Sequence, residues 1–365
     1  MELVNSLRLW AKFLETNGYK LNKCVGQGSF GDVFAVTSIG DGQSWAVKRL
    51  VARRDIRADS YAMVEIAALA SIQHPTVVRL HEVLLSPRLA CLVMELAPAG
   101  NLEMFVFQGC RLNMNLSNDK NPTCECKSYS TPVTSKENSL FDSRKRESRE
   151  IRSKPDCAPL QETQIEKGNV KPSRPESNVP SVSACRNDNC TCSRSFSLEL
   201  AFLSLAFSQV TSALNFCHNI DLAHRDINPS NVLIFNKSLV KLADFGLCFR
   251  CRDTNVGDTA DSEVKCTDYL GNDHYLAPEV RRHEPFFAKP SDIWSLGCLL
   301  YFMLQANHPP IYDSDFTDRF DPSGIVSQVS DDSLREKCLR TLSETCRSAV
   351  SARLTVDEVL ALWDM

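Results

Sequence analysis

Three oxygen-bearing side chains in the second half of the sequence could act together in catalysis: Asp226, Asn231 and Asp244. A carboxylate held next to a hydroxyl group can orient it and accept its proton. Carboxylate and amide oxygens are also the ligands that Mg²⁺ prefers in proteins. Phosphoryl transfer needs both functions. We therefore expect Asp226 to act on a hydroxyl, and Asn231 and Asp244 to hold a magnesium ion.

A glycine-rich turn near the start of the chain could bind phosphate groups. Gly26, Gly28 and Gly31 lack a Cβ, so backbone N–H groups of the turn can approach phosphate oxygens. The same pattern alone also fits an ordinary hairpin, and a dinucleotide-binding fold would need a helix directly after it. Here a strand-like run begins at Val33 where a dinucleotide-binding fold would have a helix, so the sequence favours a hairpin over that fold. Lys48 follows one hairpin later, where its ammonium group could bind phosphate.

In their order along the chain, these motifs resemble the eukaryotic protein kinase family. The matching segments are Gly26-Gln27-Gly28-Ser29-Phe30-Gly31, Lys48, His224-Arg225-Asp226, Asn231, Asp244-Phe245-Gly246 and Ala277-Pro278-Glu279. Tyr275-Leu276, just before the last segment, looks more like the serine/threonine pattern than the tyrosine kinase pattern. The resemblance implies an α+β, bilobed protein kinase fold, with a small antiparallel β lobe that carries one main helix and a larger, mainly helical lobe.

The resemblance also implies roles for individual residues. Asp226, Lys48 and Asn231 would be catalytic, and Asn231 and Asp244 would be the metal ligands. Lys48 would bind the α- and β-phosphates of ATP and pair with Glu65, for which a surface position is the alternative. The remaining positions implied to contact the nucleotide are Gly26, Gln27, Gly28, Ser29, Phe30, Gly31, Val33, Ala46, Met94, Glu95, Ala97 and Leu233.

A hinge and a scaffold are implied as well. The hinge between the lobes would follow Met94, with the backbone of Glu95 and Ala97 at the adenine edge. The implied scaffold has two parts. One is a column of stacked side chains that Asp292 would anchor, made of Leu69, Leu80, His224 and Phe245. The other is an ion pair between Glu279 and Arg353. Mutations at scaffold positions should act through folding or alignment.

Two positions depart from the pattern of serine/threonine kinases. Asn228 stands where these enzymes generally carry a lysine that neutralises the transferring γ-phosphate, and Asn272 stands where a threonine usually contacts that lysine and the catalytic aspartate. An asparagine can donate a hydrogen bond but brings no charge. Electrostatic stabilisation is the main protein contribution to this transition state. We therefore expect chemistry slowed on the order of 10- to 1000-fold if nothing compensates.

Arg225, beside Asp226, resembles the arginine of kinases whose activation loop is ordered by a phosphate, because a guanidinium group pairs bidentately with such anions. The matching loop position holds Asp268. Its carboxylate could partly replace a phosphate, although the neighbouring Thr267 could instead be phosphorylated, or Asp268 could be an ordinary exposed acid.

Hydrophobic periodicity predicts the elements that position these residues. Leu3, Leu7, Trp10 and Leu14 fall on one face of a short leading helix that would pack against the small lobe. Strands are predicted over 19–25, 33–37, 45–50, 77–83 and 90–94, and a helix over 55–72. Two helices of the second lobe are predicted. One covers 292–304, and the other is indicated by apolar residues that share one helical face, namely Leu200, Leu203, Phe207, Val210 and Leu214.

The composition changes after Phe107. From 107 to 196 the sequence is rich in Ser, Asn, Lys, Glu and Pro without a sustained period, so we predict a disordered insertion that could dock partner proteins. The predicted organisation is an N-terminal helical extension over 1–18 and a kinase domain over 19–365, interrupted by this insertion. Arg144-Lys145-Arg146 could be a docking or nuclear-import element, with a solvated run as the simpler interpretation.

Five cysteines of the insertion could in principle supply a zinc site: Cys124, Cys126, Cys185, Cys190 and Cys192. Their spacing is not that of a standard zinc finger. Reduced thiols in a flexible segment are therefore the favoured interpretation.

Composition limits the possible classes of protein. A chain of 365 residues with net charge −4 and 43% hydrophobic residues can bury a large core, and its mild acidity argues against bulk nucleic-acid binding. The apolar run over 198–207 is too short to span a bilayer, so we expect no membrane span. The N-terminus lacks the positive region of a signal peptide. The 16 cysteines are then expected to be reduced thiols in a cytoplasmic or nuclear protein.

We interpret the sequence as a protein serine/threonine kinase that transfers the γ-phosphate of Mg-ATP to a hydroxyl of a protein substrate. The alternative is a pseudokinase, an ATP-binding interaction module in which Asn228 and Asn272 leave little catalysis. A tyrosine or dual-specificity kinase is a third possibility. The presence of Asp226 favours an enzyme, because a chain selected only for binding need not retain the aspartate that acts on a hydroxyl.

Restoring the missing cation should raise the rate. We predict that Asn228→Lys increases kcat, because the ammonium group would neutralise charge on the transferring phosphate. Steady-state rates of wild-type and variant protein test this, and the absence of any gain would count against it.

Overall fold

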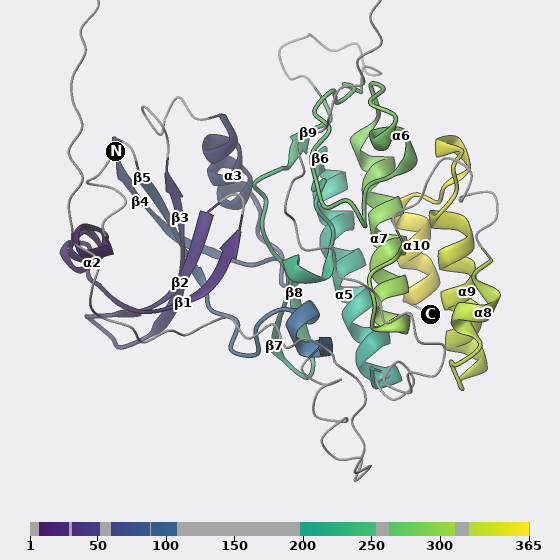
Figure 1. The fold of residues 1–365 in the computed structure, drawn as a ribbon, viewed down its shortest axis with the longest axis horizontal. Helices are drawn as coiled ribbons and strands as arrows, with labels where there is room; N and C mark the ends of the chain where they lie inside the picture. Colours follow the sequence, from purple (N-terminus) through teal and green to yellow (C-terminus); the bar gives the residue numbers. More distant parts are fainter. Residues whose placement is uncertain are drawn as a thin grey trace, which may run out of the picture. The chain divides into compact units, whose positions relative to one another are not determined.

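The computed structural model describes residues 7–28, 31–51, 60–87, 89–107, 198–252, 263–310 and 321–364 (Figure 1). Leu3, Ser29, Phe30 and the predicted start of the helix over 55–72 lie outside these residues. The predicted insertion also lies outside them beyond Phe107, together with its cysteines and its basic cluster.

The five strands of the N-terminal part form one antiparallel sheet in the described residues, in the order β1-β2-β3-β5-β4. Their bounds are Tyr19–Gly28 (β1), Gly31–Ser38 (β2), Ser44–Val51 (β3), Leu80–Ser86 (β4) and Leu89–Glu95 (β5). The predicted strands are confirmed, but the fourth was placed too early. Val77 does not belong to β4, because it forms a parallel bridge with Leu242 of the helical part instead.

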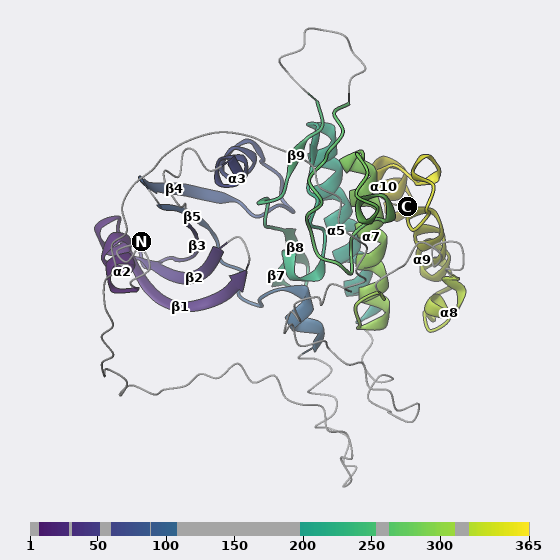
Figure 2. The ribbon, with the colours of Figure 1, turned by 45° about the horizontal axis from the view of Figure 1, so that its top comes forward.

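The two faces of the sheet are covered by different helices, which lie on opposite sides of it in Figures 1 and 2. Alternate residues of the strands, such as Phe34 and Val47, form one buried cluster with Trp10 and Leu14 of α2 (Leu7–Thr16). The Trp10 ring centroid lies 4.2 Å from that of Phe34. The predicted leading helix is thus confirmed, and it covers the outer face of the sheet.

The opposite face belongs to the main core. Leu50 and Leu92 lie on this face, in one cluster with Ala68 and Leu69 of α3 (Ser60–Ser71). Because side chains alternate along a strand, Lys48 shares the face of Leu50. The register places Lys48 opposite Leu92 of β5. The lysine therefore points to the side of the sheet that carries α3.

The C-terminal part is mainly helical. Its helices are α5 (Leu200–Asn219), α6 (Pro278–Arg281), α7 (Ala288–Gln305), α8 (Ser323–Val326), α9 (Asp332–Thr345) and α10 (Val356–Trp363). Short 3₁₀ helices run over Pro229–Asn231 (η3) and Val350–Ala352 (η5). Two small sheets pair β6 (Leu222–Ala223) with β9 (Phe249–Arg250) and β7 (Val232–Asn236) with β8 (Leu239–Leu242). Together with the antiparallel sheet, this arrangement confirms the predicted α+β, bilobed kinase fold.

The predicted helical face through Leu203, Phe207, Val210 and Leu214 is buried in α5. By length and hydropathy alone, α5 is the one described helix that could cross a membrane. Its packing is that of a core helix, because Phe207 lies 4.4 Å from the ring of Trp363 and is fully buried.

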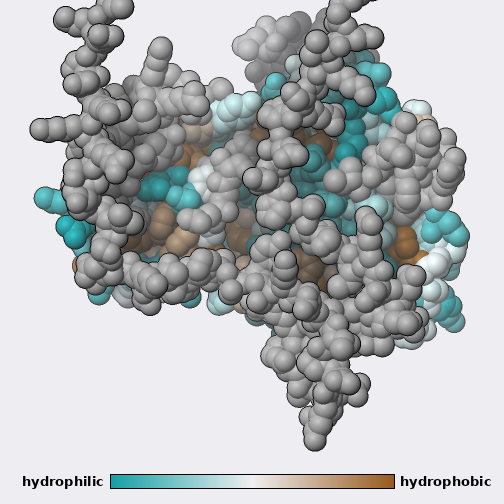
Figure 3. Space-filling model, viewed as in Figure 1, coloured by the Kyte–Doolittle hydropathy of each residue, from teal (hydrophilic) through white to brown (hydrophobic). Residues whose placement is uncertain are grey.

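The space-filling view shows hydrophilic and hydrophobic residues interspersed on the visible face (Figure 3).

We predict that Trp10→Ala lowers the free energy of unfolding by about 3–5 kcal/mol, because it leaves a large cavity against the outer face of the sheet. Chemical denaturation monitored by circular dichroism measures this. Leu9→Ala is the matched control, since Leu9 is 42% exposed on the same helix. Equal effects of the two substitutions would contradict the assignment of α2 to the folded core.

Candidate active site

The loop that carries Asp226 is held by a buried carboxylate of α7. Asp292 is fully buried, and its two oxygens accept the backbone N–H groups of His224 and Arg225, each at 2.7 Å. Arg225 has a left-handed backbone, with φ of 67°. Such a conformation is strained for a residue with a side chain, and hydrogen bonds to a charged acceptor are strong enough to maintain it.

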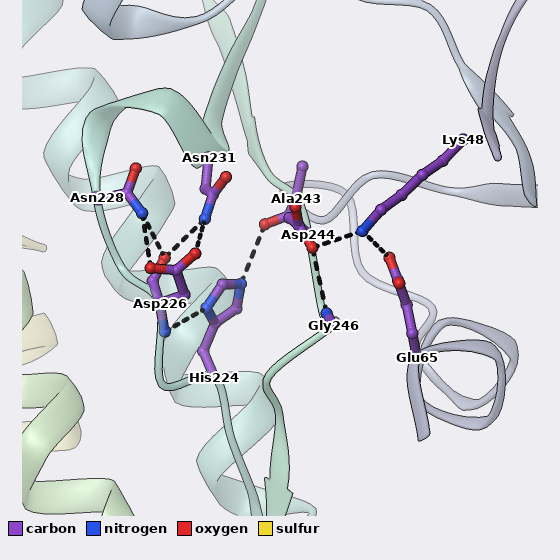
Figure 4. A network of polar contacts seen from close by, with 9 residues as sticks. All are labelled: Lys48, Glu65, His224, Asp226, Asn228, Asn231, Ala243, Asp244 and Gly246. Atoms are coloured by element: carbon purple, nitrogen blue, oxygen red, sulfur yellow. Dashed lines mark hydrogen bonds and ion pairs between the residues drawn. The ribbon is translucent and has the colours of Figure 1, made fainter. Parts of the chain in front are cut away.

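Both oxygens of the Asp226 carboxylate accept a hydrogen bond from an amide side chain (Figure 4). Asn231 Nδ2 donates to Oδ2 at 2.8 Å, and Asn228 Nδ2 donates to Oδ1 at 2.9 Å. Burial raises the pKa of the Asp226 carboxyl above its ordinary value, while these two donors favour the charged form. The carboxylate is thus fixed in direction, as a group that must meet a hydroxyl should be.

Lys48 bridges two carboxylates from different parts of the chain. Its Nζ atom lies 2.7 Å from Glu65 Oε1 and 2.7 Å from Asp244 Oδ1 (Figure 4). Burial disfavours the charged form of Lys48, but the carboxylates of Asp244 and Glu65 outweigh this effect and raise its pKa. Burial raises the pKa of Glu65 to about 7, against the lowering effect of Lys48. The alternative that Glu65 is a surface charge is wrong, since this side chain is 2% exposed.

The donor groups of Asn231 and Asp244 suit a magnesium ion. Asn231 turns its Nδ2 atom to Asp226, so its side-chain Oδ1 is the atom left for a cation. Asp244 Oδ1 accepts from Lys48 and from the Gly246 N–H, while the side chain remains 30% exposed. The Ala243 N–H donates to the main-chain carbonyl oxygen of Asn231 at 2.9 Å. This bond joins the backbone at Asn231 to the residue before Asp244, so the two predicted ligands lie on neighbouring segments. Oxygen donors of this kind fit Mg²⁺.

The predicted hairpin is present in the described residues, where β1 and β2 pair as far as the glycines that flank positions 29–30. Gly28 pairs with Gly31, and Gln27 pairs with Asp32. Gly31 has φ of 137°, and a Cβ at this position would collide with the Arg49 carbonyl oxygen. Glycine is therefore required here. Gly26 pairs with Val33 on the neighbouring strand.

The hinge is tied to both parts of the chain. The Ala99 N–H donates to the Ile234 carbonyl oxygen at 3.2 Å, and the Ile234 N–H donates to the Gly100 carbonyl oxygen at 2.8 Å. The Glu95 carboxylate accepts from the Arg79 N–H and from Lys241 Nζ, at 3.0 and 2.5 Å. Its side chain thus has a structural function beside the predicted role of its backbone.

The predicted walls of the adenine pocket come from both sides of this hinge. Ala46 is buried and lies opposite Met94 in the register of β3 and β5. Leu233 of β7 bridges to Asn101, just past the hinge and Ala97. Ala46 of β3, Met94 of β5 and Leu233 of β7 therefore all lie next to the hinge, although they belong to three different strands.

The scaffold contacts expected from the sequence are present. Glu279 and Arg353 form a buried bidentate ion pair, with nitrogen to oxygen distances of 2.6 and 2.7 Å. The His224 and Phe245 rings lie 4.7 Å apart, and Phe245 shares its core cluster with Leu69 and the partly buried Leu80.

The two departures from the kinase pattern have different environments. Asn228 is 2% exposed and contacts Asp226, whereas Asn272 is exposed and accepts the His274 N–H at 3.1 Å. Within the described residues, no hydrogen bond joins Asn272 to Asn228 or Asp226. A lysine at 228 would bring charge but no acceptor for the Ser230 N–H, so the gain expected from Asn228→Lys is reduced by the loss of that bond.

Arg225 contacts Asp268 mainly through the main chain. Its Nη2 atom donates to the Asp268 carbonyl oxygen at 2.7 Å, whereas the Asp268 carboxylate lies 3.9 Å from Nη1 and is 54% exposed. An exposed ion pair at this distance contributes little. The idea that the Asp268 carboxylate replaces an activation-loop phosphate stays a prediction. In the structure, Arg225 makes its closer contact with the main-chain oxygen of Asp268.

The sequence did not predict one contact within the candidate site: the hydrogen bond from Asn228 to Asp226. It predicted that Asn228 can donate a hydrogen bond, but it did not predict to which group. The available signal was Asn228-Pro229-Ser230, because an asparagine two residues before a serine often accepts that serine's backbone N–H. Such a bond fixes which way the amide points.

Comparison with known proteins gives a family match. The family model described as protein tyrosine and serine/threonine kinase matches residues 19–349. Mouse testis-specific serine/threonine-protein kinase 2 is 34% identical over 42% of this chain and 42% of its own length. Rice CBL-interacting protein kinase 4 is 26% identical over 82% of this chain and 47% of its own length. The chain thus spans less than half the length of these curated relatives.

Glu65 predicts a pH dependence of stability. Its pKa is about 7 in the folded protein and ordinarily 4.5, so the folded state binds more protons between these values and loses stability as pH rises through this window. We predict that Glu65→Gln flattens this fall by up to about 3 kcal/mol. Denaturation curves at several pH values without magnesium measure it. The exposed Glu15→Gln is the control, and the same slope in Glu65→Gln and wild type would contradict the prediction.

Proposed function

This chain belongs to the protein tyrosine and serine/threonine kinase family, and on that premise we propose that it transfers the γ-phosphate of Mg-ATP to a serine or threonine hydroxyl of a protein. The observation that carries the proposal is the Asp226 carboxylate, fixed through both oxygens beside two magnesium-type ligands. Relatives named as serine/threonine-protein kinases support the choice of hydroxyl.

Each residue of the site has one task in this proposal. Asp226 orients the substrate hydroxyl and accepts its proton. Lys48, held by Glu65, binds the α- and β-phosphates, and Asn231 and Asp244 bind the metal ion. When bound, Mg-ATP would supply the γ-phosphoryl group, and its magnesium ion would neutralise part of the phosphate charge.

The Lys48–Glu65 pair argues against a pure binding module. Kinase catalysis requires this pair together with the metal-binding aspartate, and here Lys48 contacts both carboxylates at once. A pseudokinase remains the second candidate because of one observation: the side chain that replaces the catalytic-loop lysine, Asn228, is uncharged. The two candidates differ in whether phosphate transfer depends on Asp226.

We predict that Asp226→Asn lowers phosphate transfer from radiolabelled ATP by about 10²- to 10⁴-fold, the contribution typical of a positioned general base. Label on a general protein substrate, resolved by phosphoamino acid analysis, is the measurement. Asp364→Asn, an exposed aspartate near the C-terminus, is the control.

Equal label in wild type and Asp226→Asn would reject the enzyme in favour of a binding module. Label found on phosphotyrosine alone would reject the serine/threonine assignment and keep the kinase.

A further inference from the structure

The Asn228 side chain is fixed at both ends. Its Oδ1 atom accepts the backbone N–H of Ser230 at 3.0 Å, and the Ser230 hydroxyl donates to the same atom. A backbone N–H can only donate, so this end of the amide must be the oxygen. The Nδ2 atom is therefore the end that faces Asp226.

Two amides hold Asp226 from opposite sides. Asn228 Nδ2 contacts the Asp226 carbonyl oxygen at 3.2 Å and Oδ1 at 2.9 Å, and Asn231 Nδ2 contacts the same carbonyl oxygen at 2.9 Å and Oδ2 at 2.8 Å. Each amide thus ties one carboxylate oxygen to the residue's own main chain (Figure 4). The pair of contacts restrains rotation of the carboxylate plane.

The short helix η3 sets the spacing of the two amides. Asn228 is its N-cap, with an extended backbone, and Asn231 is its last residue. Pro229 fixes φ at the first helical position, where its missing N–H costs no hydrogen bond. The Asn231 N–H donates to the Asn228 carbonyl oxygen at 3.1 Å, which closes the turn. The Asx cap and the turn therefore hold both donors in place before any substrate binds.

We infer that Asn228 is a positioning residue, which holds the Asp226 carboxylate in the orientation that receives the substrate hydroxyl. The inference rests on the proposed kinase function and assigns Asn228 a role through Asp226, with no contact to phosphate. A carboxylate held by two donors loses less rotational freedom when the hydroxyl arrives, and correct orientation of reacting groups contributes strongly to rate. The substitution at 228 thus removes a cation but keeps the catalytic carboxylate aligned.

The chain contains a matched motif outside the site. Asn236 Oδ1 accepts the Ser238 N–H and the Ser238 hydroxyl, both at 2.8 Å, in the turn between β7 and β8. Like Asn228, it accepts the N–H of the residue two positions on, but it does so at an exposed position at the end of β7. Within the described residues, however, Asn236 makes no hydrogen bond to a carboxylate. Asn236→Asp therefore controls for the effect of the same substitution on the same local turn.

The test separates the cap from the donor. In Asn228→Asp the side chain still accepts the Ser230 N–H, because aspartate caps as well as asparagine, but the donor to Asp226 is lost. We expect kcat to fall about 10- to 100-fold, as for a small misplacement of reacting groups, with the KM and calorimetric Kd for Mg-ATP within about twofold of wild type. The Tm should fall further than in Asn236→Asp, because the new carboxylate is buried beside that of Asp226. The uncharged Asn228→Ser should keep a Tm near that of wild type.

A second variant avoids the added charge. Asn228→Ser also keeps an acceptor for the cap, but it removes the amide donor to Asp226. It should therefore likewise lower kcat while the affinity for Mg-ATP is retained. Asn228→Ala removes cap and donor, and both kcat and Tm should fall.

Three results would overturn the inference: kcat within about twofold of wild type in Asn228→Asp and Asn228→Ser, a rise in the KM for ATP in place of the fall in kcat, or a loss of kcat that follows the loss of Tm across the series. A wild-type protein without Asp226-dependent transfer would reject the proposed function itself, which distinguishes the two failures.

Discussion

The candidate active site depends on the buried carboxylate of Asp292. This side chain is fully buried on a helix most of whose residues are buried, and it accepts two main-chain N–H groups of the loop that carries Asp226. A buried charge is costly unless its hydrogen bonds are made, so the interaction defines one conformation of the loop. The left-handed turn at Arg225 follows from it, and the turn places Asp226 next to His224.

From this anchor a continuous series of contacts reaches the sheet. His224 packs its ring on Phe245, and its Nε2 atom lies 3.1 Å from the Ala243 carbonyl oxygen. The next residue, Asp244, contacts Lys48 of β3, which contacts Glu65 of α3. A nucleotide phosphate and a metal ion would thus meet charges that the two parts of the chain supply jointly. Each contact is short and at least partly buried, which limits screening by solvent and salt.

The catalytic loop shows how one substitution can alter charge while preserving geometry. Kinases of the serine/threonine type generally place a cation where this chain has Asn228. Here the amide bonds to both the Ser230 N–H and the Asp226 carboxylate. In the proposed reaction, the charge of the transferring phosphate would then have less protein compensation, whereas the proposed base, Asp226, would remain aligned. Electrostatic stabilisation and positioning are separable contributions, and the contact of Asn228 with Asp226 would preserve the second.

The amino-acid sequence determined the order of the motifs, the five strands of the N-terminal sheet, the helices α2, α3, α5 and α7, and the pairing of Glu279 with Arg353, because period and spacing are local properties or follow from a family pattern. Tertiary structure alone decided three further features. Val77 leaves β4 to pair with Leu242, Arg225 contacts mainly the carbonyl oxygen of Asp268, and Asn228 turns its nitrogen to Asp226. Each depends on which partner lies within hydrogen-bond distance after the chain has folded, and residue types leave that choice open because backbone and side-chain groups compete for the same donors.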